Sequence, residues 1–289
     1  MEAQLLVHPN CLLGESPVWD AERNCCYWVD IEGKTIFEYW WEEGRVHRYP
    51  LDQRVSMVVP GKNNHLIVGL ETGVGRYSIR EQRLGLVTDL GIPWNNLRCN
   101  DGKCDPLGRL WIGTMDLDHK TGGGNVYCID EGQVLCKIEK VSISNGMAWS
   151  PDNKHLFYTD SPTRKIVSYS YDPSSGTISF PKTAIEIPEK LGMPDGMAMD
   201  EEGQLWVALW GGFGVARFDS NTGELITFIK IPVPNVTSCS FAGKNLDRLV
   251  ITTARKGLSE ETLKQYPASG GVFIADPGVK GTAAFTCRF

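Results

Sequence analysis

The sequence predicts an all-β fold, a six-bladed β-propeller whose blades are four-stranded sheets, and three observations lead to it. A short pattern of residues recurs six times at intervals of 39 to 49 residues, which is the length of one four-stranded blade. Segments rich in β-branched and aromatic residues follow the copies, whereas helical periodicity is nearly absent. The 289 residues also include 31 glycines and 16 prolines, which can supply the many tight turns of such a fold.

The repeat consists of a turn rich in Asp, Gly and Asn, a pair of bulky apolar residues, and then small or polar residues. In chain order the copies occupy residues 21–31, 61–70, 105–115, 150–160, 200–210 and 243–253. The second apolar residue of the pair is, in turn, Trp28, Ile67, Trp111, Phe157, Trp206 and Val250. The three tryptophans at this position are expected to form core between blades. A β-sandwich with coincidental turns is the alternative, but a sandwich does not need six similar units.

A further strand is predicted after each copy, across a short turn. These strands are expected at residues 35–42, 73–78, 124–130, 166–172, 214–219 and 271–276. They mix apolar with polar residues, as strands do when one face is solvated. Turn sequences at 172–176 (DPSSG) and 219–223 (DSNTG) are expected to close hairpins. Residues 258–266 have helical character and are expected to form a short helical turn within a loop insertion.

Six units of blade length are expected to close into one ring, so residues 1–289 are predicted to form a single domain. The N-terminal segment, about residues 3–8, is expected to pair as the outer strand of the last blade. An unpaired strand edge invites association with other chains, and pairing the last blade with the first strand removes that edge.

Composition excludes several classes of partner. The net charge of −6 argues against a nucleic acid or an anionic membrane as the main partner, because both attract basic surfaces. The N-terminus lacks the pattern of a signal peptide, and no apolar stretch approaches the roughly 18–20 residues of a membrane span. The nine cysteines are scattered and form no C-x-x-C pair, so they are expected to be free thiols in a reducing cytoplasm.

Polar residues that precede the repeated apolar pairs form a candidate metal site. Loops that feed the innermost strands of a propeller meet at one end of its channel, so such residues converge although they are distant in sequence. The four segments with such residues are 13–19, 96–111, 143–149 and 193–200. Glu15, Asn145 and Asp195 offer two carboxylates and an amide oxygen, a set that suits Ca²⁺, Mg²⁺, Mn²⁺ or Zn²⁺. Three protein ligands leave positions for water and substrate, as at a catalytic metal site in the central channel.

Taken singly, Asn145-Gly146 and Asp195-Gly196 would be ordinary turn dipeptides, and Glu15 a solvated acid. Recurrence at the same place in three blades is what supports the site, because turn chemistry does not require it. No G-x-S-x-G motif is present, so the sequence does not favour a serine hydrolase.

A set of longer motifs keeps its order and spacing from about residue 11 to 281. They are GESPVW (14–19), R-x-N-D-G-K-x-D-P-x-G (98–108), GTM (113–115), SNGMAWS (144–150), PDGMAMDEEGQLWVA (194–208), VTSCSFAGKN (236–245) and ITTAR (251–255). These motifs closely resemble the family of gluconolactonase, regucalcin (senescence marker protein) and luciferin-regenerating enzyme. Residues 208–214 and 254–273 look particularly like bacterial aldonolactonases, those for xylonolactone among them.

The resemblance implies the same three metal ligands, Glu15, Asn145 and Asp195, for one divalent ion that is Ca, Zn, Mg, Mn or Fe(II). It also implies that Arg98 and Asn100 contact substrate hydroxyls.

An acid shortly after the GTM motif completes the substrate contacts in that family, and it maps to Asp118. Many relatives carry Glu there, so the contact in this chain is shorter by one methylene. Asp116 and His119 are nearby alternatives for the same role. Asp101 is interpreted as orienting its loop and not as touching the metal.

The function implied is the metal-dependent hydrolysis of a sugar lactone, an aldonolactone such as glucono-, xylono- or arabinonolactone, to the aldonic acid. Asp195 is the candidate general base, because it would lie close to a metal-bound water. The expected partner is this small molecule, with no nucleic acid and no membrane, and the protein is expected to be a monomer or a weak homo-oligomer. Two other functions are kept as alternatives: a non-catalytic calcium-binding regulatory propeller, and a metal hydrolase of other esters including organophosphates.

Overall fold

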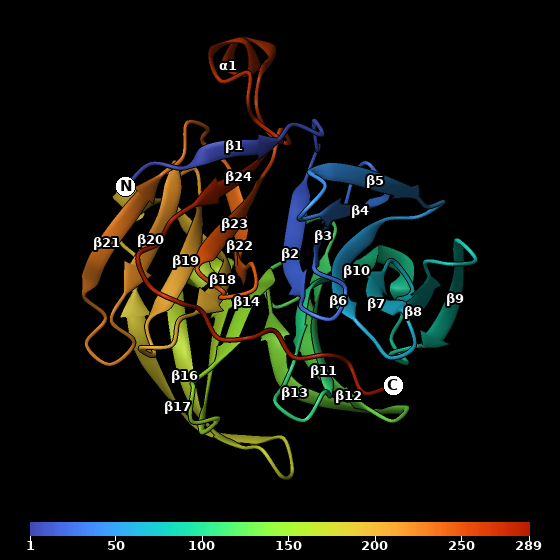
Figure 1. Cartoon of the computed structure of the whole chain (residues 1–289). Helices are drawn as coiled ribbons and strands as arrows, with labels where there is room; N and C mark the ends of the chain where they lie inside the picture. The colour runs from blue at the N-terminus through green and yellow to red at the C-terminus, as the bar shows by residue number, and fades with distance from the viewer.

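Six four-stranded antiparallel sheets stand around a central channel, so the predicted six-bladed propeller is confirmed (Figure 1). The computed structural model describes residues 1–289, apart from the side chain of Val87. The innermost strands contact one another in the closed order β2, β6, β10, β14, β18, β22 and back to β2. This ring of inner strands is the wall of the channel.

In every blade the four strands follow one another from the channel outward. Blades 1 to 3 are β2 (Gly14–Asp20), β3 (Cys25–Asp30), β4 (Thr35–Trp40) and β5 (Arg45–Pro50); β6 (Val55–Pro60), β7 (His65–Leu70), β8 (Gly73–Ser78) and β9 (Arg83–Thr88); and β10 (Leu97–Cys104), β11 (Leu110–Asp116), β12 (Gly124–Asp130) and β13 (Gln133–Val141). Blades 4 to 6 are β14 (Ser144–Trp149), β15 (His155–Asp160), β16 (Lys165–Asp172) and β17 (Thr177–Glu186); β18 (Met193–Met199), β19 (Leu205–Trp210), β20 (Gly214–Phe218) and β21 (Leu225–Lys230); and β22 (Val236–Ala242), β23 (Arg248–Thr253), β24 (Val272–Ala275) and β1 (Gln4–Val7). The six copies of the repeat coincide with the second strands of the six blades, except that β11 extends one residue beyond its copy.

Blade 6 takes its outer strand from the other end of the chain. β1 pairs antiparallel with β24, and Leu5 lies opposite Phe273 (Figure 1). The predicted closure of the ring by the N-terminal strand is therefore confirmed, with Gln4–Val7 as its bounds.

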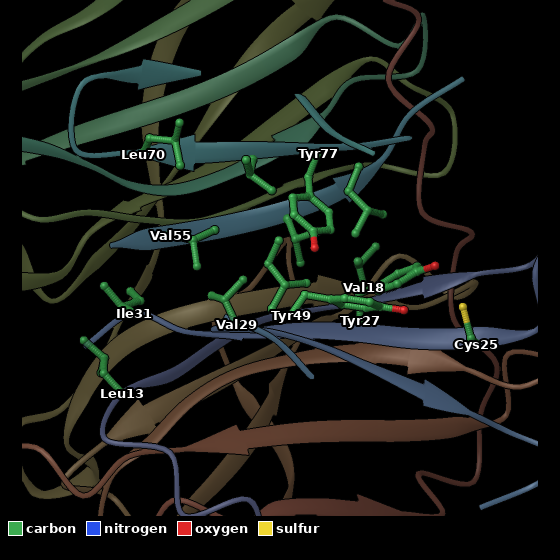
Figure 2. Packing of buried hydrophobic residues seen from close by; sticks show 14 of the residues in the cluster. Leu13, Val18, Cys25, Tyr27, Val29, Ile31, Tyr49, Val55, Leu70 and Tyr77 are labelled. Atoms are coloured by element: carbon green, nitrogen blue, oxygen red, sulfur yellow. The ribbon is translucent and has the colours of Figure 1, made fainter. Parts of the chain in front are cut away.

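The hydrophobic core lies between neighbouring blades. Figure 2 shows one part of it, where side chains of blade 1 such as Val18 and Tyr27 face Val55, Leu70 and Tyr77 of blade 2. The three tryptophans at the repeated position, Trp28, Trp111 and Trp206, are fully buried, as expected. Burial of such large side chains on both faces of each blade is the main source of stability. Among the described cysteines none is in a disulfide, and all but Cys136 are buried.

Every inner strand carries a β-bulge at the same level of the channel. In blades 1, 4 and 5 the register shifts between Glu15 and Val18, between Asn145 and Met147, and between Pro194 and Met197; the other three shifts are Val55/Met57, Cys99/Gly102 and Val236/Ser238. A bulge leaves a residue unpaired and turns side chains out of the sheet. The polar residues expected in loops before the inner strands thus lie within these strands, at their bulges.

Short helices occur in the connections. They are η1 (Trp94–Asn96), η2 (Ser161–Thr163), η3 (Glu189–Leu191) and α1 (Glu260–Gln265). α1 lies in the connection between β23 and β24 and projects from the ring, which confirms the helical turn expected there (Figure 1). Ser259 caps it, because its Oγ accepts a hydrogen bond from the backbone N–H of Thr262 at 3.1 Å. Among the described residues, no helix has the length and apolar character that a membrane crossing would require.

The last residues form a segment, here called the C-terminal strap (residues 279–289), that crosses the ring and ends near blade 3 (Figure 1). Its backbone bonds to blade 5 where the N–H of Thr282 donates to the oxygen of Met199 at 3.0 Å. It bonds to blade 2 where the N–H of Cys287 donates to the oxygen of Pro60 at 2.8 Å. The strap therefore ties together blades that are far apart in the sequence.

Candidate functional site

Glu15, Asn145 and Asp195 lie on three different inner strands, β2, β14 and β18, and line one cavity of about 420 Å³. Each stands at the bulge of its strand, which explains how residues of a paired strand can face the channel. Their exposed fractions are 8%, 5% and 6%, so the three side chains form the buried floor of the cavity. The structure thus brings the expected metal ligands into one place.

The electrostatics of this floor suit a cation. Oδ1 of Asp195 is buried and, among the described residues, has no hydrogen-bond partner. Burial and the Glu15 carboxylate raise the pKa of Asp195 well above its usual range. Burial and the Asp101 carboxylate raise the pKa of Glu15 to about 8. Positive charge between these carboxylates would favour their ionised forms, so two carboxylates and an amide oxygen fit a hard divalent cation.

The amide group of Asn145 is fixed by hydrogen bonds on both sides. Its Nδ2 donates to Oγ of Ser161 at 2.9 Å, and its Oδ1 accepts from Nδ2 of Asn100 at 3.4 Å, which leaves the second lone pair of Oδ1 for a cation. Ser161 follows a repeated strand directly and also lines the cavity. The sequence motifs did not identify Ser161, because its hydrogen bond is made to Asn145 on the neighbouring strand β14.

Arg98 and Asn100 enter the same cavity from β10 and are both buried. Nη1 of Arg98 donates to Oδ1 of Asn100 at 2.7 Å, and Nδ2 of Asn100 donates to the backbone oxygen of Ser144 at 2.7 Å. Burial lowers the pKa of Arg98, while nearby Glu32 and Glu15 act in the opposite direction. Arg98 therefore presents its remaining N–H donors beside the carboxylate floor. Nδ2 of Asn100 bonds to Ser144 and Asn145, so Asn100 offers a ligand only its amide oxygen, which already accepts from Arg98.

Asp118 stands apart from these five residues. It is exposed in the turn after β11, and its Oδ2 accepts a hydrogen bond from Nδ2 of Asn96 at 2.9 Å. The wall of the cavity at this turn is formed by His119 and Met115. Asp116 is buried and shapes the turn, because its Oδ1 accepts from the N–H of Asp118 at 2.8 Å. The substrate contact assigned to Asp118 remains a prediction.

Asp101 follows Asn100 at the bulge of β10, where the register shifts between Cys99 and Gly102. Its Oδ1 accepts from the N–H of Gly102 at 2.8 Å, and it lines a smaller cavity of about 70 Å³ further along the channel. Lys103 lines that cavity too, and its Nζ donates to the backbone oxygen of Met197. Residues 282–285 of the C-terminal strap complete the lining. Asp101 therefore lines a different cavity from Glu15 and Asp195, although its carboxylate is near enough to raise the pKa of both; its supporting role stays a prediction.

Two further residues, Trp210 and Lys256, line the upper part of the larger cavity together with Gly257. No chemical motif marked them. The available signal was that both fall within the segments, 208–214 and 254–273, that look particularly like bacterial aldonolactonases.

Comparison with known proteins gives a consistent result. The sequence profile described as "SMP-30/Gluconolactonase/LRE-like region" matches residues 13–255. A protein of Bacillus subtilis, provisionally named a sugar lactone lactonase, is 36% identical over 276 residues, which cover 95% of this chain and 94% of that protein. Regucalcin of Gallus gallus is 36% identical over 277 residues, covering 93% and 92%. The crystal structure of a calcium-binding protein, regucalcin, from Agrobacterium tumefaciens matches with a TM-score of 0.95 at 27% identity, covering 99% and 97%.

Proposed function

The chain belongs to the SMP-30/gluconolactonase/LRE-like family, and from that premise we propose that it is a metal-dependent hydrolase of a sugar lactone. The substrate is an aldonolactone such as glucono-, xylono- or arabinonolactone, and the product is the aldonic acid. The whole chain, residues 1–289, acts as one domain. The observation that carries the proposal is the meeting of Glu15, Asn145 and Asp195 on one buried floor, where Oδ1 of Asp195 lacks a hydrogen-bond partner among the described residues.

These three residues would hold one divalent ion, which is Ca, Zn, Mg, Mn or Fe(II). When bound, such an ion supplies Lewis-acid polarisation of the lactone carbonyl and charge for the developing oxyanion.

The protein's own groups perform the remaining tasks. Asp195 takes the proton of the attacking water, because its Oδ1 faces the cavity without a competing donor among the described residues. Arg98 and Asn100 bind ring hydroxyls and orient the lactone, and the guanidinium of Arg98 also steadies negative charge on the product. Asp118 is proposed to contact a hydroxyl on a part of the substrate that extends beyond the cavity.

The proposal is tested by hydrolysis of a lactone panel. The protein is stripped with a chelator and reconstituted with each of the five metals in turn. Turnover of glucono-, xylono-, arabinono- and galactonolactone is followed by acid release, beside a phosphotriester. Metal-restored hydrolysis of at least one sugar lactone is expected, and hydrolysis that is unaffected by chelation would contradict the metal dependence.

A non-catalytic calcium-binding role is the second candidate, and it is supported by the description of the Agrobacterium tumefaciens structure as a calcium-binding protein. Calcium binding by calorimetry with no turnover of any lactone would favour it. Preferred turnover of the phosphotriester would instead favour a hydrolase of other esters, organophosphates among them.

A further inference from the structure

Lys256 stands at the mouth of the large cavity. It lines the same cavity as the buried floor, but its side chain is 45% exposed, whereas the residues of the floor are almost inaccessible. A ligand that rests its reacting group on the floor and fills this cavity would therefore meet Lys256 at its more exposed end.

The backbone of Lys256 is fixed on both sides. Its N–H donates to the oxygen of Leu12 at 2.8 Å, and its oxygen accepts from Nδ2 of Asn235 at 3.0 Å. Leu12 precedes the inner strand of blade 1, and Asn235 precedes that of blade 6. The start of the long β23–β24 connection is thus held by blade 1 and by its own blade, blade 6, and the backbone from which the Lys256 side chain extends has the fixed position that selective recognition requires.

The side chain of Lys256 is the first member of an ion-pair chain, here called the mouth ladder (Lys256, Glu32, Arg54 and Glu71). Nζ of Lys256 lies 2.5 Å from Oε1 of Glu32, and Nε of Arg54 lies 2.8 Å from the other oxygen of Glu32. Nη1 of Arg54 lies 2.7 Å from Oε1 of Glu71. Burial alone would raise the pKa of Glu32, but hydrogen bonds from Lys256 and Arg54 outweigh it and lower that pKa.

The mouth ladder has two positive and two negative members and hence no net charge. An ammonium carries three N–H donors, and the contact with Glu32 uses one of them. The other donors of Lys256 make no hydrogen bond to the described residues, so they are available to oxygen atoms of a ligand. A balanced set of charges with free donors suits a neutral hydroxylated ligand.

We propose that Lys256 is a specificity-determining residue, which donates to a hydroxyl of the sugar lactone at the end remote from the carbonyl. The inference rests on the function proposed above. A phosphorylated lactone would have to draw Lys256 away from Glu32 and would meet the Glu32 carboxylate, so the mouth ladder also selects against anionic substrates.

The decisive comparison is wild type against Lys256→Met, which keeps the aliphatic stem and loses the donors. Lys264→Met is the matched control, because Lys264 is exposed on α1 in the same connection. For glucono-1,5-lactone, Lys256→Met is expected to raise KM about tenfold with kcat within about twofold, as loss of a hydrogen bond to a charged donor predicts. γ-Butyrolactone, which has no hydroxyls, should be hydrolysed equally by all three proteins. An equal loss on both lactones would overturn the proposal, since Lys256 would then only support the cavity.

Glu32→Gln tests the charge balance separately, because it leaves the mouth ladder with a net charge of +1. The ratio of kcat/KM for 6-phosphogluconolactone to that for gluconolactone should rise several-fold, and the rise should shrink with added salt. An unchanged ratio would contradict selection by charge.

The proposed function can fail without deciding the role of Lys256, and the two failures give different results. If wild type hydrolyses no lactone with any metal, that function is wrong, and binding still decides the role of Lys256. 1,5-Anhydro-D-glucitol keeps the ring hydroxyls but has no carbonyl, and its binding can be followed by ligand-observed NMR. Weaker binding to Lys256→Met than to wild type and Lys264→Met supports the proposal, whereas equal or absent binding to all three overturns it.

Discussion

The glycines that follow Asn145 and Asp195 help to aim these two side chains into the cavity. A Cβ at Gly146 would lie 2.5 Å from the backbone oxygen of Asp195, and one at Gly196 would lie 2.0 Å from Oγ of Ser238. Neighbouring inner strands therefore approach each other at these glycines too closely for any side chain. Asn-Gly and Asp-Gly, which commonly mark turns, here mark bulges.

Gly146→Ala tests this close approach. The added methyl group should push β14 from β18, destabilise the protein by about 1–3 kcal/mol, and weaken metal binding by displacing ligands on both strands. Thermal unfolding and calorimetric titration with a divalent metal measure the two effects. Gly85→Ala is the control, because a Cβ there would meet nothing within 4 Å. Unchanged metal affinity in Gly146→Ala would show that this strand contact does not position the ligands.

Asp195→Ala and Asn145→Ala should each abolish tight divalent-metal binding and lactone turnover while the circular dichroism spectrum stays that of wild type. The blades pack through other residues, so the fold should not depend on these ligands. Metal-free Asp195→Ala should be at least as stable as metal-free wild type, because a buried carboxylate without a partner is removed. Wild-type metal affinity in both variants would refute the site.

Asp118→Ala should leave that affinity unchanged, since Asp118 is exposed and outside the cavity wall. The variant should hydrolyse hydroxylated lactones less well, by roughly tenfold if a hydrogen bond to a charged group is lost, and spare γ-butyrolactone. Calorimetric metal titration and lactone turnover measure these two effects. Equal loss on every lactone would place Asp118 in the chemistry or in folding.

At the scale of the element, blade 1 contains a buried carboxylate that joins three of its strands. Glu38 of β4 is 1% exposed and accepts hydrogen bonds from the hydroxyls of Tyr27 at 2.8 Å and Tyr49 at 2.6 Å, on the strands to either side. Nη2 of Arg23 donates to it at 2.9 Å. Burial alone would raise the pKa of Glu38, but the donors, Tyr49 first, outweigh it and lower that pKa.

Glu38→Gln should therefore lower the free energy of unfolding by about 3 kcal/mol at pH 7, since a buried charged pair is broken. A lowered pKa means that the stabilisation is present above the unfolded pKa of about 4.5 and is lost as pH falls through the folded pKa. The difference from wild type should accordingly shrink below that pH in urea unfolding curves. Glu43→Gln, at an exposed ion pair with Arg45, should change stability by less than about 1 kcal/mol.

The strands were predictable to the extent that they carry a local pattern. Second and third strands of the blades have apolar pairs next to turn residues, so their places follow from the sequence. The bulges do not, because one extra residue in a strand leaves composition and alternation nearly unchanged. The sequence offered Asp118, Asp116 and His119 for one role and could not choose among them, because which side chain lines the cavity depends on a turn that Asp116 shapes through its side chain.

For the whole molecule, the closed ring was predictable from six repeats and from the need to pair the last edge. β1 completes blade 6, so removal of residues 1–8 should expose the edge of β24. We expect the melting temperature to fall, on the order of 5 °C, and the protein to associate in size-exclusion chromatography. A synthetic peptide of residues 1–9 added in excess should restore the melting temperature by strand addition. A truncated protein that stays monomeric and equally stable would show that β1 is dispensable.

The C-terminal strap was not predicted. Phe285, Cys287 and Phe289 alternate with Thr286 and Arg288 and pack against the core between blades 2 and 3, but this run is too short to mark an element by itself, and the rest of the strap is held by backbone hydrogen bonds. It crosses the channel at the end opposite the large cavity and lines the smaller cavity there. Under the proposed function, lactone and acid would consequently share one entrance. Under the proposed function, added aldonate should therefore inhibit competitively, with initial rates that recover fully at high lactone concentration. If the proposed function holds, hydrolysis at a fixed lactone concentration slows as the acid accumulates, so its throughput depends on how quickly the next reaction removes that acid.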